Sequence, residues 1–222
     1  MNFIYRMHEG FGRGTSVEGF NSITCLQNFL SCIKNRDNLT IFIDNSSDNF
    51  YEQVKEIHSN VLKINLGNSK SFLHTVDYAI KNFDINHKVY FVENDYLHRS
   101  NIEKYLEDGF NTSADFVSLY DHPDKYREYP DLLSKIFLGK TSYWRTTPST
   151  CMTFATTVKK LIEHYNLIKE ACSLPIPEDH KLFTNIQLTG DILVTPIPGR
   201  ATHLEKNYLS PFINWLKYKN NI

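Results

Sequence analysis

Two carboxylates separated by one residue, Glu93 and Asp95, follow directly on the uninterrupted apolar run 89–92. Such a run is typical of a strand buried on both faces of a parallel sheet. Ligands of open α/β sheets bind just beyond the carboxyl ends of the strands. Two acids at this spacing can turn their oxygens toward one hard cation such as Mg²⁺ or Mn²⁺. The alternative is a polar turn, because Asn and Asp are common turn formers.

Three further polar residues lie where chemistry is common. Asp44 follows the apolar segment 39–43 and could bond a ribose or a base, or simply start an Asx turn. Asp179 precedes a short predicted helix, where the helix dipole favours acids and where a general base could point into a cleft. His203 lies in an irregular stretch; a lone histidine is usually structural, but neutral histidine is also a common metal ligand.

Two other stretches allow a functional and a structural interpretation. The glycine-rich segment 8–14 does not match the dinucleotide fingerprint, because its third glycine comes too early. It could still bring backbone N–H groups and Arg13 to a diphosphate, or be a surface loop. Tyr143 and Trp144 could form an apolar platform for a sugar, although such a tryptophan more often belongs to the core.

The elements that must position these residues alternate regularly over the first hundred positions. Apolar segments at 3–7, 39–43, 61–65 and 88–92 read as strands, and the intervening segments carry apolar residues at helical spacing. This alternation predicts a parallel, doubly wound α/β sheet. Right-handed crossovers would bring the strand ends near Glu9, Asp44, Gly67 and Glu93 to one edge. The convergence favours a site over a simple turn at Glu93.

The rest of the chain predicts a smaller, mixed part of the sheet. Strands are expected at 115–120, 135–138, 142–146, 151–155 and 192–194, and the long loop 121–135 has the size of a lid or recognition element. Ser22 is expected to cap the first helix, and Ser100 with Glu103 to form a capping box. The amphipathic tail 212–217 should dock on the domain.

Composition bounds the possible functions. The chain has 222 residues, of which 41% are hydrophobic, an ordinary balance for a globular protein. Its formal net charge of −1 does not indicate a basic surface for nucleic acid. Its four cysteines have no zinc or CxxC spacing, which favours reduced thiols. No apolar run is long enough for a membrane span, and the first residues lack the features of a signal peptide. We therefore expect a soluble, cytoplasmic protein.

Three motifs, in this order, resemble those of nucleotide-diphospho-sugar glycosyltransferases of the GT-A fold. Segment 90–95 resembles their DxD motif, 177–182 their ED motif at the acceptor-side helix, and 202–205 the late histidine that completes a metal site. The first acid is Glu93 rather than Asp, and the glycine-rich loop has no counterpart. The resemblance extends over the single domain 1–222, with a nucleotide-sugar-binding half at 1–98 and an acceptor-side half and tail at 99–222.

The resemblance implies a Rossmann-like sheet and a divalent cation, Mn²⁺ or Mg²⁺, held by Asp95 and His203 with Glu93 as a further candidate. It implies that Asp179 is the base of an inverting sugar transfer to a hydroxyl of a sugar or glycan acceptor, in glycan or polysaccharide synthesis. The donor, a nucleoside-diphosphate sugar, would be contacted by Arg6, His8, Asp44, Lys70, Asn94 and Asp95, with Arg13 an alternative phosphate ligand. The acceptor would be contacted by Trp144 and Glu178.

Two other functions use the same residues. A metal-dependent nucleotidyltransferase or phosphoesterase could employ these carboxylates, although the neighbouring strand ends lack a second carboxylate cluster. A non-catalytic module could bind a nucleotide sugar without turning it over.

Overall fold

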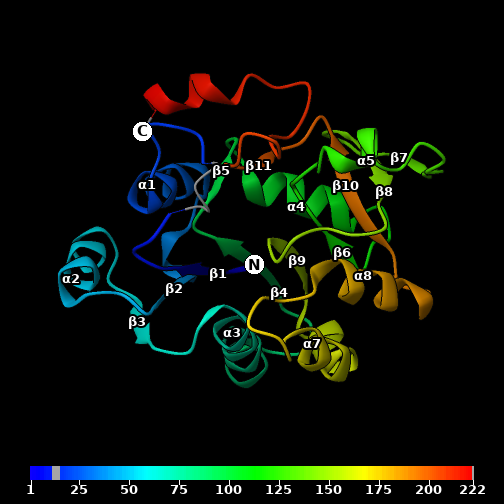
Figure 1. Cartoon of the computed structure of the whole chain (residues 1–222). Helices are drawn as coiled ribbons and strands as arrows, with labels where there is room; N and C mark the ends of the chain where they lie inside the picture. Colours follow the sequence, from blue (N-terminus) through cyan, green and yellow to red (C-terminus); the bar gives the residue numbers. More distant parts are fainter. Residues whose placement is uncertain (12–15, 222) are drawn as a thin grey trace.

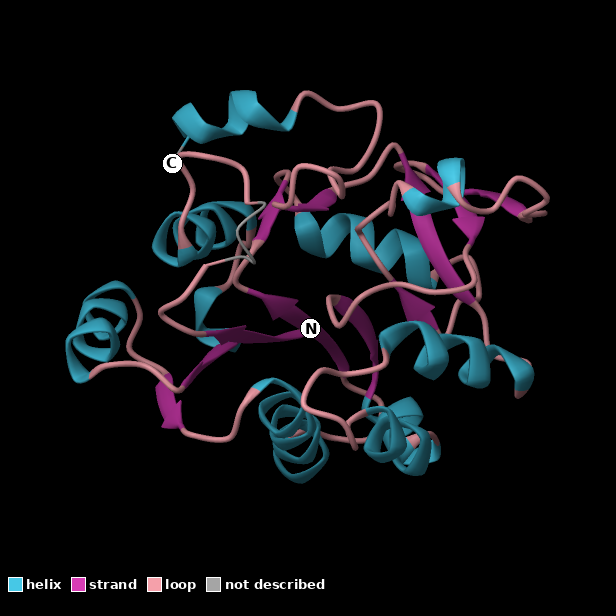
Figure 2. Cartoon of the chain, viewed as in Figure 1, coloured by secondary structure: helices cyan, strands magenta, loops and turns pink. Residues whose placement is uncertain are grey.

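One sheet of nine strands organises the molecule. The structure, a computed structural model, describes residues 1–11 and 16–221, with side chains to Tyr218 (Figure 1). The strand order is β3-β2-β1-β4-β9-β6-β10-β8-β7, and helices lie on both sides of the sheet (Figure 2). The predicted α/β class with a Rossmann-like sheet is therefore confirmed.

The first half of the sheet is parallel. Its four strands pair in the order β3-β2-β1-β4, as the alternating pattern predicts. The strands are β1 (Asn2–Met7), β2 (Leu39–Asp44), β3 (Val61–Ile64) and β4 (Lys88–Glu93). The helices between them are α1 (Ser22–Cys32), α2 (Asp48–Ile57) and α3 (Asn68–Asn82), with a 3-10 turn η1 (Arg36–Asn38) before β2. All six residues of β2 are buried, which explains its mostly apolar sequence.

The second half of the sheet is mixed. β9 runs antiparallel to β4 and β6, β10 is parallel to β6, and β7 and β8 form an antiparallel pair at the edge. These strands are β6 (Phe116–Val117), β7 (Ile136–Leu138), β8 (Tyr143–Thr146), β9 (Phe154–Thr157) and β10 (Leu193–Ile197). The helices are α4 (Ile102–Phe110), α5 (Asp124–Arg127), α6 (Val158–Glu163), α7 (Tyr165–Ala171), α8 (Asp179–Leu188) and the 3-10 helix η2 (Trp215–Asn221).

A separate two-stranded ribbon joins the two halves. β5 (Tyr96–His98) starts immediately after the turn that follows β4, and it pairs antiparallel with β11 (Ala201–His203). The register places Tyr96 opposite His203 and His98 opposite Ala201. Neither strand was expected from the sequence, because three residues are too few to show a period.

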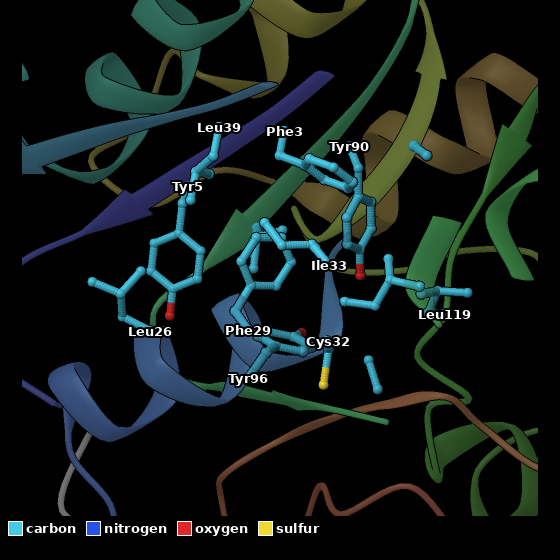
Figure 3. Packing of buried hydrophobic residues seen from close by; sticks show 14 of the residues in the cluster. Phe3, Tyr5, Leu26, Phe29, Cys32, Ile33, Leu39, Tyr90, Tyr96 and Leu119 are labelled. Atoms are coloured by element: carbon cyan, nitrogen blue, oxygen red, sulfur yellow. The ribbon is translucent and has the colours of Figure 1, made fainter. Parts of the chain in front are cut away.

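Apolar side chains fill both faces of the sheet, since successive residues of a strand point to opposite sides. In β1, Phe3 and Tyr5 face α1 while Ile4 faces α3. Figure 3 shows Phe29 of α1 against Phe3 and Tyr5, with ring centroids 5.7 and 5.3 Å apart. Each face is thus closed by helices whose apolar stripes the sequence indicates.

Several local expectations are corrected. Asn21, not Ser22, caps α1, and its side chain accepts the Thr24 N–H. The capping box at Ser100 does not form: Asn101 takes the cap position at φ 66°, and the Glu103 carboxylate accepts the backbone N–H of Lys34 instead. The strand expected at 115–120 is reduced to β6, and the strand expected at 151–155 begins only at Phe154.

The C-terminal segment docks on the domain, as the amphipathic tail predicts. Trp215 is 2% exposed and packs with Val17, Cys25 and Leu204 in a small apolar cluster. Its indole N–H donates to the Ser210 carbonyl at 2.8 Å. None of the helices among residues 1–11 and 16–221 combines the length and the apolar character needed to cross a membrane.

A buried carboxylate anchors the β7–β8 edge to α4. Asp108 accepts hydrogen bonds from the Trp144 indole (3.0 Å), the backbone of Lys140 (2.7 Å), and both the backbone and hydroxyl of Thr141 (3.0 and 2.7 Å). Burial acts to raise the Asp108 pKa, but the hydrogen bonds from Thr141 and Trp144 outweigh it and hold the pKa below its ordinary value.

We expect Asp108→Ala to lower the free energy of unfolding by roughly 3 kcal/mol, because one buried donor, the Trp144 indole, and three partly buried donors lose their acceptor. The loss should be full at neutral pH and should shrink below about pH 4, where protonation weakens the native carboxylate. Urea denaturation at several pH values measures it. Asp131→Ala, at an exposed loop position, is the control and should change the free energy by less than about 0.5 kcal/mol. An equal effect of both variants would contradict the assignment.

Candidate active site

A cleft of about 630 Å³ opens at the carboxyl ends of the parallel strands. The ends of β1, β2 and β4 contribute Arg6, Asp44 and Glu93, and the start of α3 contributes Gly67. The opposite wall comes from the second half of the chain. Its residues are His122, Asp124, Glu128, Cys151, Met152, Ile176, Pro177, Asp179, His203, Glu205 and Tyr208.

The strand ends converge as the crossover rule predicts. Asp44 accepts the backbone N–H groups of Leu66 and Gly67 at 2.7 and 2.9 Å, so it fixes the loop that leads into α3. Glu9 accepts the N–H of Ser47 at 3.0 Å. Both oxygens of Asp44 are thereby used within the protein, although the residue still lines the cleft.

Asp95 and His203 meet across 108 residues of sequence. Asp95 lies in the turn between β4 and β5, and His203 is the last residue of β11, so the ribbon register brings them together. Their side chains approach to 2.8 Å between Oδ2 and Nε2. The other oxygen of Asp95, Oδ1, is buried and has no hydrogen-bond partner among the described residues.

Glu93 is paired differently. Its Oε1 accepts from Nη2 of Arg6 at 2.7 Å. Nη1 of the same guanidinium donates to Oδ1 of Asn68 at 2.6 Å and to Oγ of Ser71 at 3.0 Å. Arg6 therefore ties β1, β4 and the first turn of α3 to one another.

The electrostatics separate the two acids. Burial raises the pKa of Glu93 to about 6, although Arg6 acts to lower it. Burial also acts to raise the pKa of Asp95, but His203 outweighs it and holds this pKa below its ordinary value. Burial acts to lower the pKa of His203, which Asp95 and Glu93 nevertheless keep above its ordinary value. Asp95 therefore loses its proton at a lower pH than Glu93.

Asp179 begins α8 and lines the opposite wall of the same cleft. Burial raises the pKa of its carboxyl, against hydrogen bonds from the His180 N–H (2.7 Å) and the Cys151 side chain. A carboxylate with a raised pKa is a stronger base than an ordinary one. The geometry thus permits proton transfer from a ligand in the cleft.

His8 and Asn94 line the cleft but differ in their freedom. The Asn94 amide nitrogen donates to the Ser22 hydroxyl at 2.7 Å and to the His8 carbonyl at 2.9 Å, so it holds the loop after β1. Among the residues that the structure describes, its amide oxygen accepts no hydrogen bond. The side chain of His8 is exposed.

Three predicted residues do not reach the cleft. Lys70 is exposed on α3, whose cleft-facing positions are Asn68 and Ser71. Glu178 lies before α8 and forms an ion pair with Lys181 at 3.6 Å. Trp144 is fully buried, and its indole N–H donates to Asp108. It therefore cannot touch an acceptor. The prediction of an apolar platform at this residue is wrong, and Trp144 belongs to the core. Arg13 lies outside the described residues.

The sequence indicated some cleft residues without naming them. Asn68 and Ser71 lie one turn apart after Gly67, the spacing of a helix start. His122, Asp124 and Glu128 come from the loop 121–135 that has the size of a recognition element. Nothing in the sequence distinguished Cys151 or Tyr208 from core residues.

The donor set of Asp95 and His203 fits a divalent cation. Carboxylate oxygen and imidazole nitrogen are ligands of Mn²⁺. Oδ1 of Asp95, which has no hydrogen-bond partner among the described residues, is a further oxygen that could coordinate a metal at the same place. Another group of possible ligands, Glu163, His164 and Asp191, lies outside the cleft. There the ammonium of Lys160 bonds Asp191 at 2.8 Å and Glu163 at 3.0 Å, so that group is an internal ion-pair network.

We expect Glu93 in the metal-free protein to titrate with a midpoint of about 6, measured from its carboxyl chemical shift. Asp95→Asn should lower this midpoint, because it removes a negative charge that disfavours ionisation of Glu93. Asp131→Asn, in an exposed loop, should leave it unchanged. A midpoint at the ordinary value of about 4.3 would show that burial does not govern this group.

Comparison with known proteins places the fold. No family model and no curated protein matches the sequence. Among solved structures, GalNAc-T7 with UDP, GalNAc and Mn²⁺ superposes with a TM-score of 0.60 at 11% identity, over 93% of this chain and 44% of that one. S. aureus TarS 1–349 with UDP-GlcNAc gives 0.55 at 13% identity over 94% and 57%, and without it 0.50 at 13% over 94% and 59%. The chain thus spans roughly half the length of these proteins, and it has the GT-A fold that its motifs indicate.

Proposed function

We propose that the protein is a metal-dependent glycosyltransferase that moves a sugar from a nucleoside-diphosphate sugar to a hydroxyl acceptor with inversion, in glycan or polysaccharide synthesis. One observation carries the proposal. The Asp95–His203 pair, in which Oδ1 of Asp95 has no hydrogen-bond partner among the described residues, lines the same cleft as the half-buried carboxylate Asp179. Metal ligands and a base in one cleft are what such a transfer needs.

The charge of the cleft supports a cation-dependent donor. Seven carboxylate side chains but only one guanidinium, that of Arg6, belong to the described lining residues. Arg6 is already paired with Glu93. A diphosphate would meet net repulsion there unless a cation enters with it. The seven acids are Asp44, Glu93, Asp95, Asp124, Glu128, Asp179 and Glu205.

On the donor side, the protein's role is to hold and orient. Asp95 and His203 would hold the divalent cation, which supplies positive charge for the diphosphate as it leaves. His8, Asp44 and Asn94 lie at the strand ends where a nucleoside would be accommodated. Arg6 keeps Glu93 and the start of α3 in place, so the wall of the donor half is rigid before ligand arrives.

On the acceptor side, Asp179 would take the proton from the attacking hydroxyl. The hydroxyl oxygen then bonds to the anomeric carbon while the bond from that carbon to the diphosphate oxygen breaks, which inverts the configuration. The His180 N–H donates to Oδ1 of Asp179 at 2.7 Å and holds the carboxylate in position. GalNAc-T7 with UDP, GalNAc and Mn²⁺, and TarS with UDP-GlcNAc, share this fold, which supports a nucleotide-sugar donor.

We expect Mn²⁺ together with a matching nucleoside diphosphate to raise the melting temperature by about 5–10 °C at a hundredfold excess over Kd. Asp95→Ala should abolish the shift, because it removes the metal ligand. Differential scanning fluorimetry with uridine, guanosine and thymidine diphosphates measures it. Asp131→Ala is the control and should keep the full shift. The proposal fails if none of these nucleotides shifts the wild type.

We expect Asp179→Asn to keep this nucleotide-dependent shift but to slow sugar transfer by about 10²-fold or more, because the amide cannot accept the proton. Release of the nucleoside diphosphate from the cognate donor in the presence of acceptor measures it. Glu178→Gln, next to the base but outside the cleft, should transfer at the wild-type rate. Full activity of Asp179→Asn would show that the base is another group.

A further inference from the structure

The β5–β11 ribbon ends in two arginines on the side opposite the cleft. Arg99 directly follows β5 and Arg200 directly precedes β11, and the Arg99 N–H donates to the Arg200 carbonyl at 2.8 Å. Asp95 and His203 occupy the other end of the same ribbon. Neither arginine lines the cleft.

The Arg200 side chain is held in place but not neutralised. Its guanidinium lies 3.8 Å from the centroid of the Tyr105 ring, and Nη2 donates to the Ser100 carbonyl at 2.8 Å. The residue is 8% exposed, and its Nε is buried without a hydrogen-bond partner among the described residues. Over the described part of the chain, no carboxylate forms an ion pair with Arg200 or with Arg99. Arg99 and burial both lower the pKa of Arg200, with burial the larger cause.

The guanidinium of Arg200 reaches the N-terminus of α4. This helix begins at Ile102. Asn101 occupies the N-cap position in the left-handed region, but its side chain forms no capping hydrogen bond. The first N–H groups of a helix lack intrahelical partners and carry the positive end of its dipole. Glu103 does not replace the missing cap, because one of its oxygens accepts the Lys34 N–H at 2.6 Å.

We propose that Arg99, Arg200 and the uncapped start of α4 form a second binding site, for a phosphate monoester or a similar oxyanion. A helix N-terminus offers N–H donors to such an anion, and guanidinium groups bond its oxygens in pairs. Neither arginine is paired with a carboxylate in the described part of the chain, and the helix dipole adds positive charge, so the local charge favours an anion. A bound phosphate would also relieve the repulsion between the two arginines.

Isothermal titration of inorganic phosphate into the full chain, without divalent cation, tests the proposal. The wild type should bind phosphate saturably. Arg99→Gln keeps the Arg200–Tyr105 stacking and should weaken binding at least about tenfold, a difference of about 1.4 kcal/mol. The double variant Arg99→Gln/Arg200→Gln should not bind. Lys81→Gln removes the same charge from an exposed position on α3 and should bind as the wild type.

The proposal is overturned if the wild type does not bind phosphate saturably, or if Arg99→Gln and Lys81→Gln behave alike. It is also overturned if nucleoside diphosphate with Mn²⁺ displaces the phosphate competitively, because the anion would then occupy the cleft. Co-sedimentation with phosphatidylcholine vesicles, with and without phosphatidic acid, separates the ligand sources. Sedimentation that requires Arg99 identifies a lipid headgroup, whereas phosphate binding without sedimentation identifies a soluble ligand. Neither readout depends on sugar transfer.

Discussion

The arrangement of the cleft depends on the charge balance around two neighbouring, partly buried carboxylates. Glu93 and Asp95 repel each other, and removal from water penalises both. Each receives a cationic partner from a distant part of the chain: Arg6 from β1 at 2.7 Å and His203 from β11 at 2.8 Å. Because Arg6 also bonds the first turn of α3, the position of that helix depends on the same charge balance.

Much of the parallel half of the sheet could be predicted from the sequence, because the patterns that indicate its strands and helices lie within short segments. Each strand is a short, mostly apolar segment, each helix shows a periodic apolar stripe, and the handedness of the crossovers then determines which strand ends meet. The β5–β11 pairing could not be predicted in this way. It joins segments of three residues separated by about a hundred positions, and such short segments have no measurable period. The failed cap at Ser100 has a similar cause, since a distant N–H, that of Lys34, takes the Glu103 carboxylate.

The site residues also divide into those that local sequence patterns indicate and those that depend on contacts between distant segments. Asp95, Asp179 and His203 were indicated by residue type and order along the chain, and the structure brings all three to one cleft. Trp144 was misplaced as an acceptor platform because an aromatic side chain suits a core and a binding surface equally well. Its buried indole N–H bonds Asp108 on helix α4, a partner that no local pattern reveals. Contacts between distant segments, rather than propensities, decided these positions.

The docking of Trp215 has a consequence for ligand affinity. The segment that carries His203 is held by a three-residue ladder and by one apolar cluster around this indole. A molecule in which the segment has opened has lost one of its candidate metal ligands. The measured dissociation constant of a cation that needs both Asp95 and His203 equals the intrinsic constant divided by the fraction of closed molecules. Local unfolding of the C-terminal segment therefore sets an upper limit on affinity, and the cation in turn suppresses that unfolding.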